Sequence, residues 1–349
     1  MKRKNLNANK ITLNFYKKNL KKKKVKELYK KFKRNFDYLK IDKICVLVSG
    51  GPDSLALLFL LKCYSLEKKI KIYCYLVDHK IREESSLEAK KVKLFLKKYL
   101  IDCKILVNKE KITPSNLQSK ARLIRYNLAF KESKKNKIKY IFTGHHRDDF
   151  YENFFIRLVR GSGLKGLVSF HNVKSKIKKE SDIKIIRPLI NFNKNQLKYI
   201  VDETFIYYVK DPMNNSNTFL RSRIREMIVK LGKDGLKLKK LEQTLSNLAD
   251  SDHSIDFYVK KNITVNVINK KDFMLLNSNF FENSSEVVFR SLNIILLKFS
   301  KKNNYARGKK LKFLINWLEN ETTSKKLTLS GCIFEKTSNT VLISRENDK

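Results

Sequence analysis

Glycine, proline and tryptophan are scarce in this sequence of 349 residues, and acidic residues are fewer than half as many as basic ones. There are 10 Gly, 4 Pro and 1 Trp, and 34 Asp and Glu stand against 77 Lys and Arg. The formal net charge of +43 would give a strongly positive field that suits a polyanion such as nucleic acid. Drift in an AT-rich genome would also favour Lys, Asn, Ile and Phe. The charge by itself therefore leaves both explanations open.

Cysteine pairs and long apolar runs are absent as well. The cysteines are odd in number and none belongs to a C-x-x-C pair, which excludes a disulfide framework and a structural zinc knuckle; they are Cys45, Cys63, Cys74, Cys103 and Cys332. No stretch approaches the roughly 20 apolar residues of a membrane span, and the lysine-rich start lacks the apolar run of a signal peptide. We expect buried, reduced cysteines in a cytoplasmic protein with no membrane segment.

The length favours two domains, because 349 residues exceed what one hydrophobic core usually serves. Apolar residues at helical spacing predict a helical lead over residues 1–36. We expect a catalytic domain over 37–217 and a C-terminal region over 218–349, with the boundary near Asn217.

Strand and helix patterns alternate in the first of these regions. The predicted strands are 44–48, 71–77, 103–107 and 140–143, and the predicted helices between them are 55–61, 86–100 and 117–133. This alternation predicts an α/β fold with a mostly parallel sheet covered by helices on both faces. Ligands bind such sheets beyond the carboxyl ends of the strands.

The character of the sequence changes after Pro188. Helices are predicted at 194–205, 218–248, 284–299 and 308–318, and short strands near 326–329 and 341–344. The C-terminal region is therefore expected to be smaller and mainly helical.

A glycine-rich turn joins the first buried strand to the next helix. It reads Ser49-Gly50-Gly51-Pro52-Asp53-Ser54. Two glycines let backbone N–H groups approach a phosphate, and the start of a helix favours an anion. The absence of G-x-x-x-x-G-K-[ST] excludes a Walker loop, and Asp53 beside a phosphate suggests a bridging Mg²⁺. The alternative is a simple Gly-Pro turn with a Ser cap.

Acidic and histidine residues cluster after the fourth predicted strand. Asp149 and Glu152 are three residues apart, so on a helix they share a face and could hold one Mg²⁺ against phosphate oxygens. His145 or His146, or Arg125, could stabilise charge on a transferring phosphoryl group. Capping carboxylates in a solvated first turn are the alternative.

Asp78 and several arginines complete the candidates. Asp78 ends a predicted strand and could accept a hydrogen bond from a ribose or adenine, although strand-end turns also favour Asp. Arg157 and Arg160 precede two glycines, which suits either an RNA-facing loop or an ordinary helix C-cap. Arg221, Arg223 and Arg225 cannot all share one helical face, so we expect them to spread across a groove or serve separate partners.

The turn at 49–54 resembles the signature loop of the PP-loop ATP pyrophosphatases, which cleave ATP to AMP and pyrophosphate by adenylating a substrate oxygen. Further stretches resemble the tRNA(Ile)-lysidine synthase family within that group. They are 77–79, 81–82, 86, 88–89, 121–122, 125–126, 143–152, 157–167, 187–189, 211–217, 221, 223 and 225. As an ordered series over roughly residues 42–230, they are far more specific than one motif.

The resemblance implies a sheet of the PP-loop, adenine nucleotide alpha hydrolase-like type. It implies that ATP and Mg²⁺ activate the wobble cytidine of a tRNA(Ile) with a CAU anticodon, that free L-lysine is then joined to C2, and that a homodimer is possible. The catalytic residues would be Asp53, Arg125, His145, Asp149 and Glu152, with Asp53, Asp149 and Glu152 also holding the metal. The nucleotide would lie on Ser49, Gly50, Gly51, Pro52, Asp53, Ser54, Asp78 and Gly144, and the RNA on Arg157, Arg160, Arg221, Arg223 and Arg225.

Two departures and two rival functions remain. The family usually has an amide and a hydroxyl where this chain has Phe150 and Asn153, and no motif is matched beyond residue 245. A PP-loop thiolase or amidotransferase is disfavoured by the missing C-x-x-C pair and the lack of an N-terminal cysteine. A non-catalytic basic RNA-binding module would leave the ordered motifs unexplained.

Overall fold

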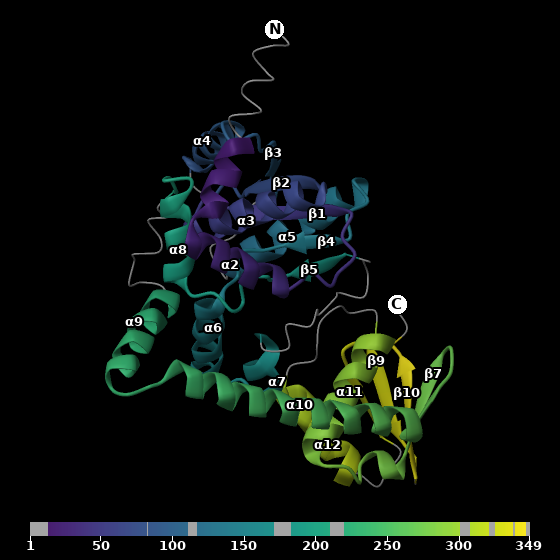
Figure 1. Cartoon of the computed structure of the whole chain (residues 1–349). Helices are drawn as coiled ribbons and strands as arrows, with labels where there is room; N and C mark the ends of the chain where they lie inside the picture. The colour runs from purple at the N-terminus through teal and green to yellow at the C-terminus, as the bar shows by residue number, and fades with distance from the viewer. Residues whose placement is uncertain are drawn as a thin grey trace. The chain divides into compact units, whose positions relative to one another are not determined.

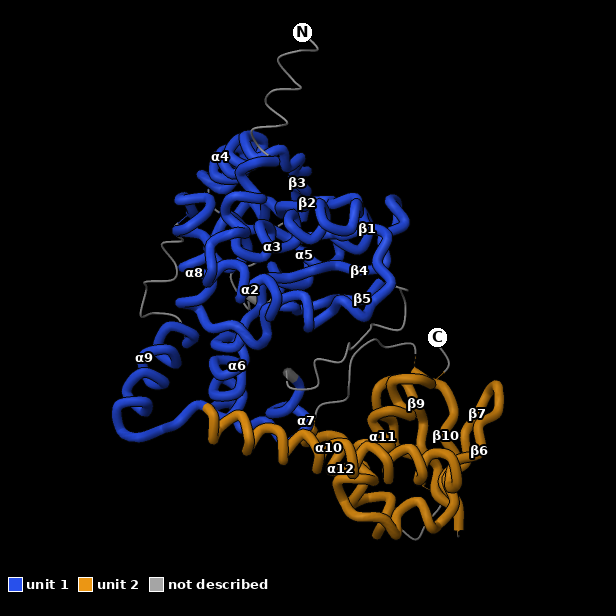
Figure 2. Tube along the Cα trace, viewed as in Figure 1, with its two compact units in different colours: residues 1–238 blue, residues 239–349 orange. Residues whose placement is uncertain are grey.

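The computed structural model describes residues 13–81, 83–110, 117–170, 183–209, 220–300, 308–320, 325–337 and 339–346. They form two compact units, residues 1–238 and 239–349 (Figure 2). The helix α9 (Leu220–Lys233) lies in unit 1, although its residues belong to the predicted C-terminal region 218–349. The functional boundaries expected at residues 36 and 217 stay predictions.

Unit 1 is built on a five-stranded sheet in the order β3-β2-β1-β4-β5 (Figure 1). All its neighbouring strands pair in parallel. The strands are β1 (Lys43–Val48), β2 (Lys71–Asp78), β3 (Cys103–Val107), β4 (Tyr140–Phe142) and β5 (Lys184–Ile186). The predicted parallel α/β sheet is confirmed, and β5 was not among the predicted strands.

Side chains of β1 alternate between two cores, one on each face of the sheet. Ile44, Val46 and Val48 belong to one buried cluster, and Cys45 and Leu47 to another. Helices on the first face are α2 (Lys23–Arg34), α3 (Pro52–Lys68), α4 (Ser85–Lys97) and α8 (Lys194–Glu203), and the second face carries α5 (Leu117–Lys135). Because both faces are covered, β1 is an unbroken apolar run and not an alternating one.

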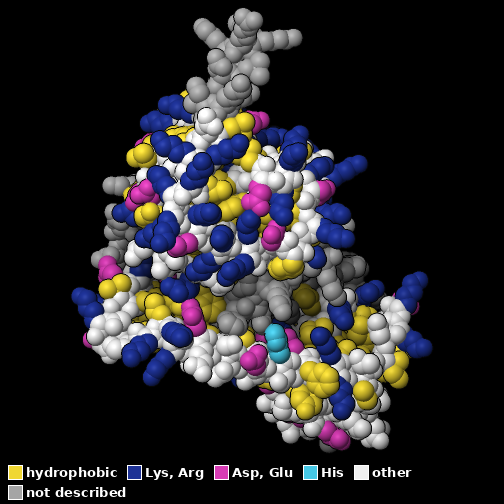
Figure 3. Space-filling model, in the orientation of Figure 1, with side chains coloured by type: hydrophobic (Ala, Val, Ile, Leu, Met, Phe, Trp, Pro, Cys, Tyr) yellow, Lys and Arg dark blue, Asp and Glu magenta, His cyan; other side chains and the backbone are white. Residues whose placement is uncertain are grey.

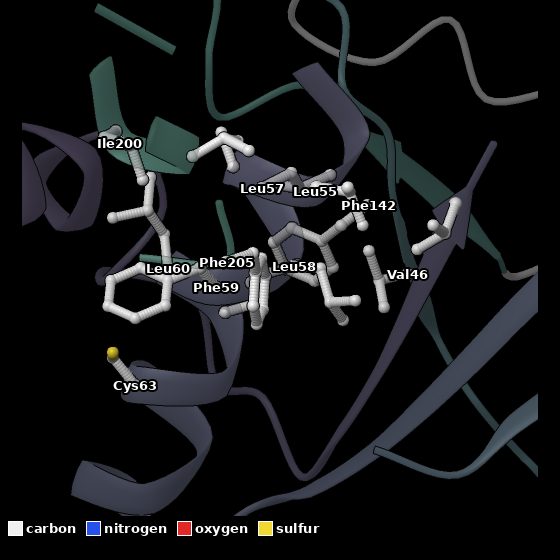
Figure 4. Close-up of a cluster of buried hydrophobic side chains, with 14 of the residues drawn as sticks. Val46, Leu55, Leu57, Leu58, Phe59, Leu60, Cys63, Phe142, Ile200 and Phe205 are labelled. Atoms are coloured by element: carbon white, nitrogen blue, oxygen red, sulfur yellow. The ribbon is translucent and has the colours of Figure 1, made fainter. Parts of the chain in front are cut away.

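The helix α3 fills the centre of the larger core. Its residues from Ser54 to Leu61 are all buried, and Figure 4 shows Leu55, Leu58 and Phe59 among side chains of the sheet and α8. Each buried Leu or Phe contributes about 1.5–3 kcal/mol through removal from water. The start of α3 is therefore held firmly in place, which fixes the turn that precedes it.

Further helices of unit 1 follow the fourth strand of the sheet. The helix α6 (Arg147–Val159) follows β4, and a short helix α7 (Leu164–Leu167) and a 3₁₀ turn η1 (Val168–Phe170) come after it. The helix α9 packs against α6.

In the described residues of unit 2, three helices accompany a five-stranded antiparallel sheet in the order β6-β7-β10-β9-β8. The helices are α10 (Leu238–Asn266), α11 (Ser285–Phe299) and α12 (Gly308–Asn320), and the strands β6 (Val267–Asn269), β7 (Phe273–Asn277), β8 (Lys326–Leu329), β9 (Cys332–Lys336) and β10 (Thr340–Arg345). A 3₁₀ turn, η3 (Ser278–Phe280), follows β7. The mainly helical C-terminal region is confirmed. Its sheet was predicted only at β8 and β10.

The five cysteines are all buried, as expected. In the described part of the chain, no helix is both long and apolar enough to cross a bilayer. On the face seen in Figure 3, Lys and Arg side chains are spread widely over the surface and do not gather into one patch. Such scatter does not mark a specific interface.

Candidate active site

The turn between β1 and α3 has the geometry of a phosphate-binding loop. Gly51 is extended and precedes the first helical residue, Pro52, while Gly50 has a φ of +83° that favours glycine. The Ser54 hydroxyl donates to the Gly51 carbonyl at 2.9 Å and accepts from the Ser49 N–H at 3.2 Å. These bonds hold the turn closed over the helix N-terminus, where the free N–H groups favour an anion.

Two glycines allow other segments to approach this loop. A Cβ on Gly50 would lie 2.7 Å from Cγ2 of Val92, and one on Gly144 would lie 3.3 Å from the backbone of Asp53. The Val209 N–H donates to the Gly50 carbonyl at 2.9 Å. The turn after β4 therefore packs directly on the loop 49–54, and the nucleotide-binding role of Gly144 stays a prediction.

Asp78 lies at the carboxyl end of β2 and lines a pocket of about 240 Å³ beside this loop. Its buried carboxylate accepts from the Ser86 hydroxyl at 2.6 Å and from the Lys80 N–H at 3.0 Å. The pocket is also lined by Ser49, Arg125 and apolar side chains of β1, β2 and α4. A mostly apolar hollow with a few fixed polar groups suits a nucleobase and its sugar.

His79 lines the same pocket and was not singled out as a site residue from the sequence. Both of its ring nitrogens are buried without a hydrogen-bond partner. Burial lowers the pKa of His79 to about 4, and the nearby Arg125 lowers it too. Arg125 itself makes no hydrogen bond or ion pair to a described residue, and burial lowers its pKa.

His146 lies among the aspartates at the start of α6. It is 3% exposed and caps α6, where its Nδ1 accepts from the Asp148 N–H at 3.2 Å. Its Nε2 lies 3.4 Å from Oδ2 of Asp53 and 3.8 Å from Oδ2 of Asp149. Burial alone would lower the pKa of His146, but Asp53, Asp149 and Asp148 together raise it. The imidazole thus joins the phosphate-binding loop to α6.

Asp149 and Glu152 share one face of α6, as predicted, and two arginines of α9 contact them. Arg221 donates to Asp149 and to Glu152, each at 2.6 Å, and Arg225 donates to Glu152. Glu152 is only 4% exposed. Arg221 and Arg225 thus face the acidic pair, whereas Arg223, between them, points outward and is exposed.

His145 faces a different group of side chains. Its Nε2 lies 3.0 Å from Nη1 of Arg122 and its Nδ1 lies 2.9 Å from the Thr143 hydroxyl. Burial lowers the pKa of His145 well below its ordinary value, and Arg122, Arg187, Arg125 and Arg221 lower it further. The ring is therefore neutral. Because guanidinium N–H groups only donate, Nε2 must carry the lone pair.

The remaining predicted RNA residues lie at the end of α6. Arg157 donates to the Gly166 carbonyl at 3.0 Å, and Arg160 is exposed. Burial lowers the pKa of Arg157, and Arg160 and Arg122 lower it further.

The residues around Asp53 have the chemistry of a Mg²⁺ site. The Oδ1 atom of Asp53 is buried without a hydrogen-bond partner, and Asp53 and Asp149 both lie within 4 Å of the His146 ring. Mg²⁺ is usually held by one or two carboxylates with phosphate oxygens and water. Among the described residues no group of three or more Asp, Glu, His or Cys forms a ready-made cage. Glu152 would first have to release Arg221 and Arg225.

Sequence comparison adds the following findings. The family model described as the PP-loop domain matches residues 18–231. A tRNA(Ile)-lysidine synthase of Orientia tsutsugamushi (strain Boryong) is 32% identical over 317 residues, which cover 87% of this chain and 70% of that protein. One of Rickettsia akari (strain Hartford) is also 32% identical, over 329 residues that cover 92% and 75%.

Among solved structures, the U34-tRNA thiolase NcsA from Methanococcus maripaludis with its 4Fe-4S cluster is similar to this chain. The TM-score is 0.53 and the sequence identity 24%, and the match covers 64% of this chain and 79% of that one. This likeness concerns the fold of the sheet and its helices.

Proposed function

The chain belongs to the tRNA(Ile)-lysidine synthase family, whose core is a PP-loop domain, and from this we propose how it joins lysine to its tRNA. The reaction consumes ATP and links lysine to C2 of the wobble cytidine of a tRNA(Ile) with a CAU anticodon. The products are lysidine, AMP and pyrophosphate. The observation that carries the assignment is the phosphate-binding turn at Gly50 and Gly51, braced by Gly144 and flanked by Asp53.

The chemistry has two steps. The C2 oxygen of the cytosine attacks the α-phosphorus of ATP, and the bond to pyrophosphate breaks. An amine of lysine then forms a bond to C2, loses a proton, and AMP departs with the former C2 oxygen. Adenylation turns a poor leaving group into a good one, and the protein contributes positioning and charge neutralisation.

ATP is expected to lie along the carboxyl edge of the sheet. The pocket at Asp78 accepts the adenine and ribose, with the Asp78 carboxylate prepared by Ser86 and the Lys80 N–H. The phosphates extend over the turn 49–54 toward Gly144. Mg²⁺, when bound, would be held by Asp53 and Asp149, with Glu152 as a further ligand, and would neutralise phosphate charge.

The roles of the charged side chains remain predictions. Arg125 lines the pocket and is proposed to stabilise phosphate charge, while His145 lies at the neighbouring turn beside Arg122. Arg157, Arg160 and Arg223 are proposed as RNA contacts. Arg221 and Arg225 reach RNA in this proposal only by leaving Asp149 and Glu152. We also propose action in the cytoplasm on free L-lysine, with a homodimer as a possible assembly.

The test is pyrophosphate release by the purified chain with labelled lysine. A tRNA(Ile) transcript with a CAU anticodon is compared with the same transcript carrying uridine at the wobble position. Release and lysine incorporation that both require the cytidine are expected. Release without incorporation would keep the PP-loop chemistry but reassign the acceptor. RNA binding with no nucleotide turnover would favour a binding module and contradict the proposal.

A further inference from the structure

Arg122 lies within electrostatic reach of three other arginines, Arg125, Arg157 and Arg187. Its charge is among the causes that lower the pKa of Arg125, Arg157 and Arg187, after the larger effect of burial. The four guanidinium groups come from α5, α6 and the segment after β5. Like charges brought together in this way repel one another unless an anion lies among them.

Arg122 is held in a fixed orientation by neutral groups. Its Nη1 donates to Nε2 of His145 at 3.0 Å, and its Nη2 to the Tyr126 hydroxyl at 3.4 Å. The guanidinium carbon lies 5.3 Å from the centre of the Tyr126 ring. Within the described residues Arg122 forms no ion pair with a carboxylate, in contrast to Arg221 and Arg225. Its full charge and its remaining N–H groups are therefore available to a ligand.

This environment also defines what His145 does. The Thr143 hydroxyl lies at Nδ1 and Arg122 at Nε2, so the ring bridges the end of β4 to α5. A neutral imidazole whose Nε2 already accepts a hydrogen bond from Arg122 is poorly suited to exchange a proton with a substrate. The geometry favours a positioning residue over the catalytic role expected from the sequence.

We infer that Arg122, oriented by His145 and Tyr126, binds a phosphate group of one of the two phosphate-bearing substrates. The inference rests on the proposed function for the identity of those substrates. A planar guanidinium matches two phosphate oxygens at once, which lysine cannot do. The phosphate belongs either to the tRNA backbone beside the target base or to ATP, and binding measurements separate the two.

The experiment measures dissociation constants of the full chain for the CAU tRNA transcript and for a non-hydrolysable ATP analogue with Mg²⁺. Arg122→Gln is compared with Arg34→Gln, which removes one charge from an exposed position on α2. A lost charged contact should weaken binding of one ligand about ten- to hundredfold. If that ligand is tRNA, the slope of log K against log salt should also fall by about 0.7–0.9. If it is ATP, the tRNA slope stays unchanged.

Equal affinities of Arg122→Gln and Arg34→Gln for both ligands would overturn the inference. Arg122→Lys keeps the positive charge and is the control for a loss of binding that is caused by misfolding. It should recover less than half of the lost binding free energy, because it cannot form the paired contact.

The positioning role is tested with His145→Gln, whose amide oxygen can reach the position of Nε2 and accept from Arg122, and with His145→Leu, which has no acceptor. The Gln variant should keep most of the binding, while the Leu variant should match Arg122→Gln and add nothing to it in the double variant. Additive losses would refute the coupling. Failure of the proposed function would instead appear as wild-type protein that releases no pyrophosphate with CAU tRNA, whatever the variants bind.

Discussion

Replacing Glu152 with Gln should destabilise unit 1 because it removes a buried charge to which two arginines are paired. The Glu152 side chain is 6% exposed, and those of Arg221 and Arg225 are 37% and 32% exposed. Breaking a fully buried pair costs about 3–5 kcal/mol and an exposed one less than about 1 kcal/mol. Because the arginines are partly screened by water, we expect a loss of about 1–3 kcal/mol.

Thermal unfolding of the full chain measures this loss. For a unit of this size, about 1 kcal/mol corresponds to a shift of about 2–4 °C in Tm, so Tm should fall by about 2–12 °C. Arg223→Gln is the matched control, since it removes one charge from the exposed side of the same helix, and its effect should stay within about 0.5 kcal/mol. The double variant Glu152→Gln with Arg225→Gln should show a coupling of about 0.5–3 kcal/mol.

The result also separates two roles of Glu152. An unchanged Tm together with lost pyrophosphate release would refute the ion-pair reasoning and favour Glu152 as a ligand of the metal. A fall in Tm with release retained at low temperature would mean that Glu152 serves α9 and not the metal.

Three further predictions follow from single side chains. Asp53→Asn should lower the rate of pyrophosphate release at least about a hundredfold. The loss of Tm should be small, because Oδ1 of Asp53 has no protein partner and an amide can still contact His146, which lies 3.4 Å from Oδ2. Near-normal release would exclude Asp53 as a metal ligand. In the folded protein His79 has a pKa of about 4, below its ordinary 6.5, so the folded state binds fewer protons than the unfolded state between these values. The free energy of unfolding should therefore decrease as pH falls from about 6.5 to about 4. His79→Leu should flatten that part of the pH profile of unfolding. In unit 2 the side chains of Arg290 and Asp252 are each 3% exposed and their charged atoms lie 2.6 Å apart, so Arg290→Met should lower the free energy of unfolding by about 3–5 kcal/mol. Urea unfolding, followed by the fluorescence of the single tryptophan, Trp317, measures this loss. A variant as stable as the wild type would contradict the pairing.

Local patterns predicted the sheet and its connections well. The run from Ile44 to Val48 and the turn that follows it are specified by residues adjacent in sequence, and β1 extends that run by only one residue, to Lys43. The helix α3 begins at Pro52 and not at Leu55, because proline suits the first turn of a helix and Gly51 can act as its N-cap. The strand β5 was missed, since its three residues are only half-buried, whereas the equally short β4 was found from its buried apolar residues.

The partners of the charged side chains could not be predicted in the same way. Arg221 and Arg225 are four residues apart, a spacing that puts them on one helical face, and the acidic pair of α6 has a spacing of three. Which helix packs against which depends on tertiary structure and cannot be inferred from local spacing. The sequence therefore predicted RNA binding for Arg221 and Arg225, whose side chains contact Glu152 in the folded chain. His146 had a local signal, since His at the N-cap and Asp149 at N3 form a capping box.

The large positive charge of the chain is a weaker guide to function than the placement of a few arginines. Lys and Arg side chains are spread over the visible surface without gathering (Figure 3), as expected if composition alone had increased their number. Near the acidic pair, Arg221 and Arg225 are neutralised by carboxylates, whereas Arg122 is held by neutral groups. Only an arginine of the second kind brings uncompensated charge to the site. Its loss should therefore weaken binding of a phosphate-bearing substrate, whereas loss of Arg225 should first destabilise the contact of α9 with α6.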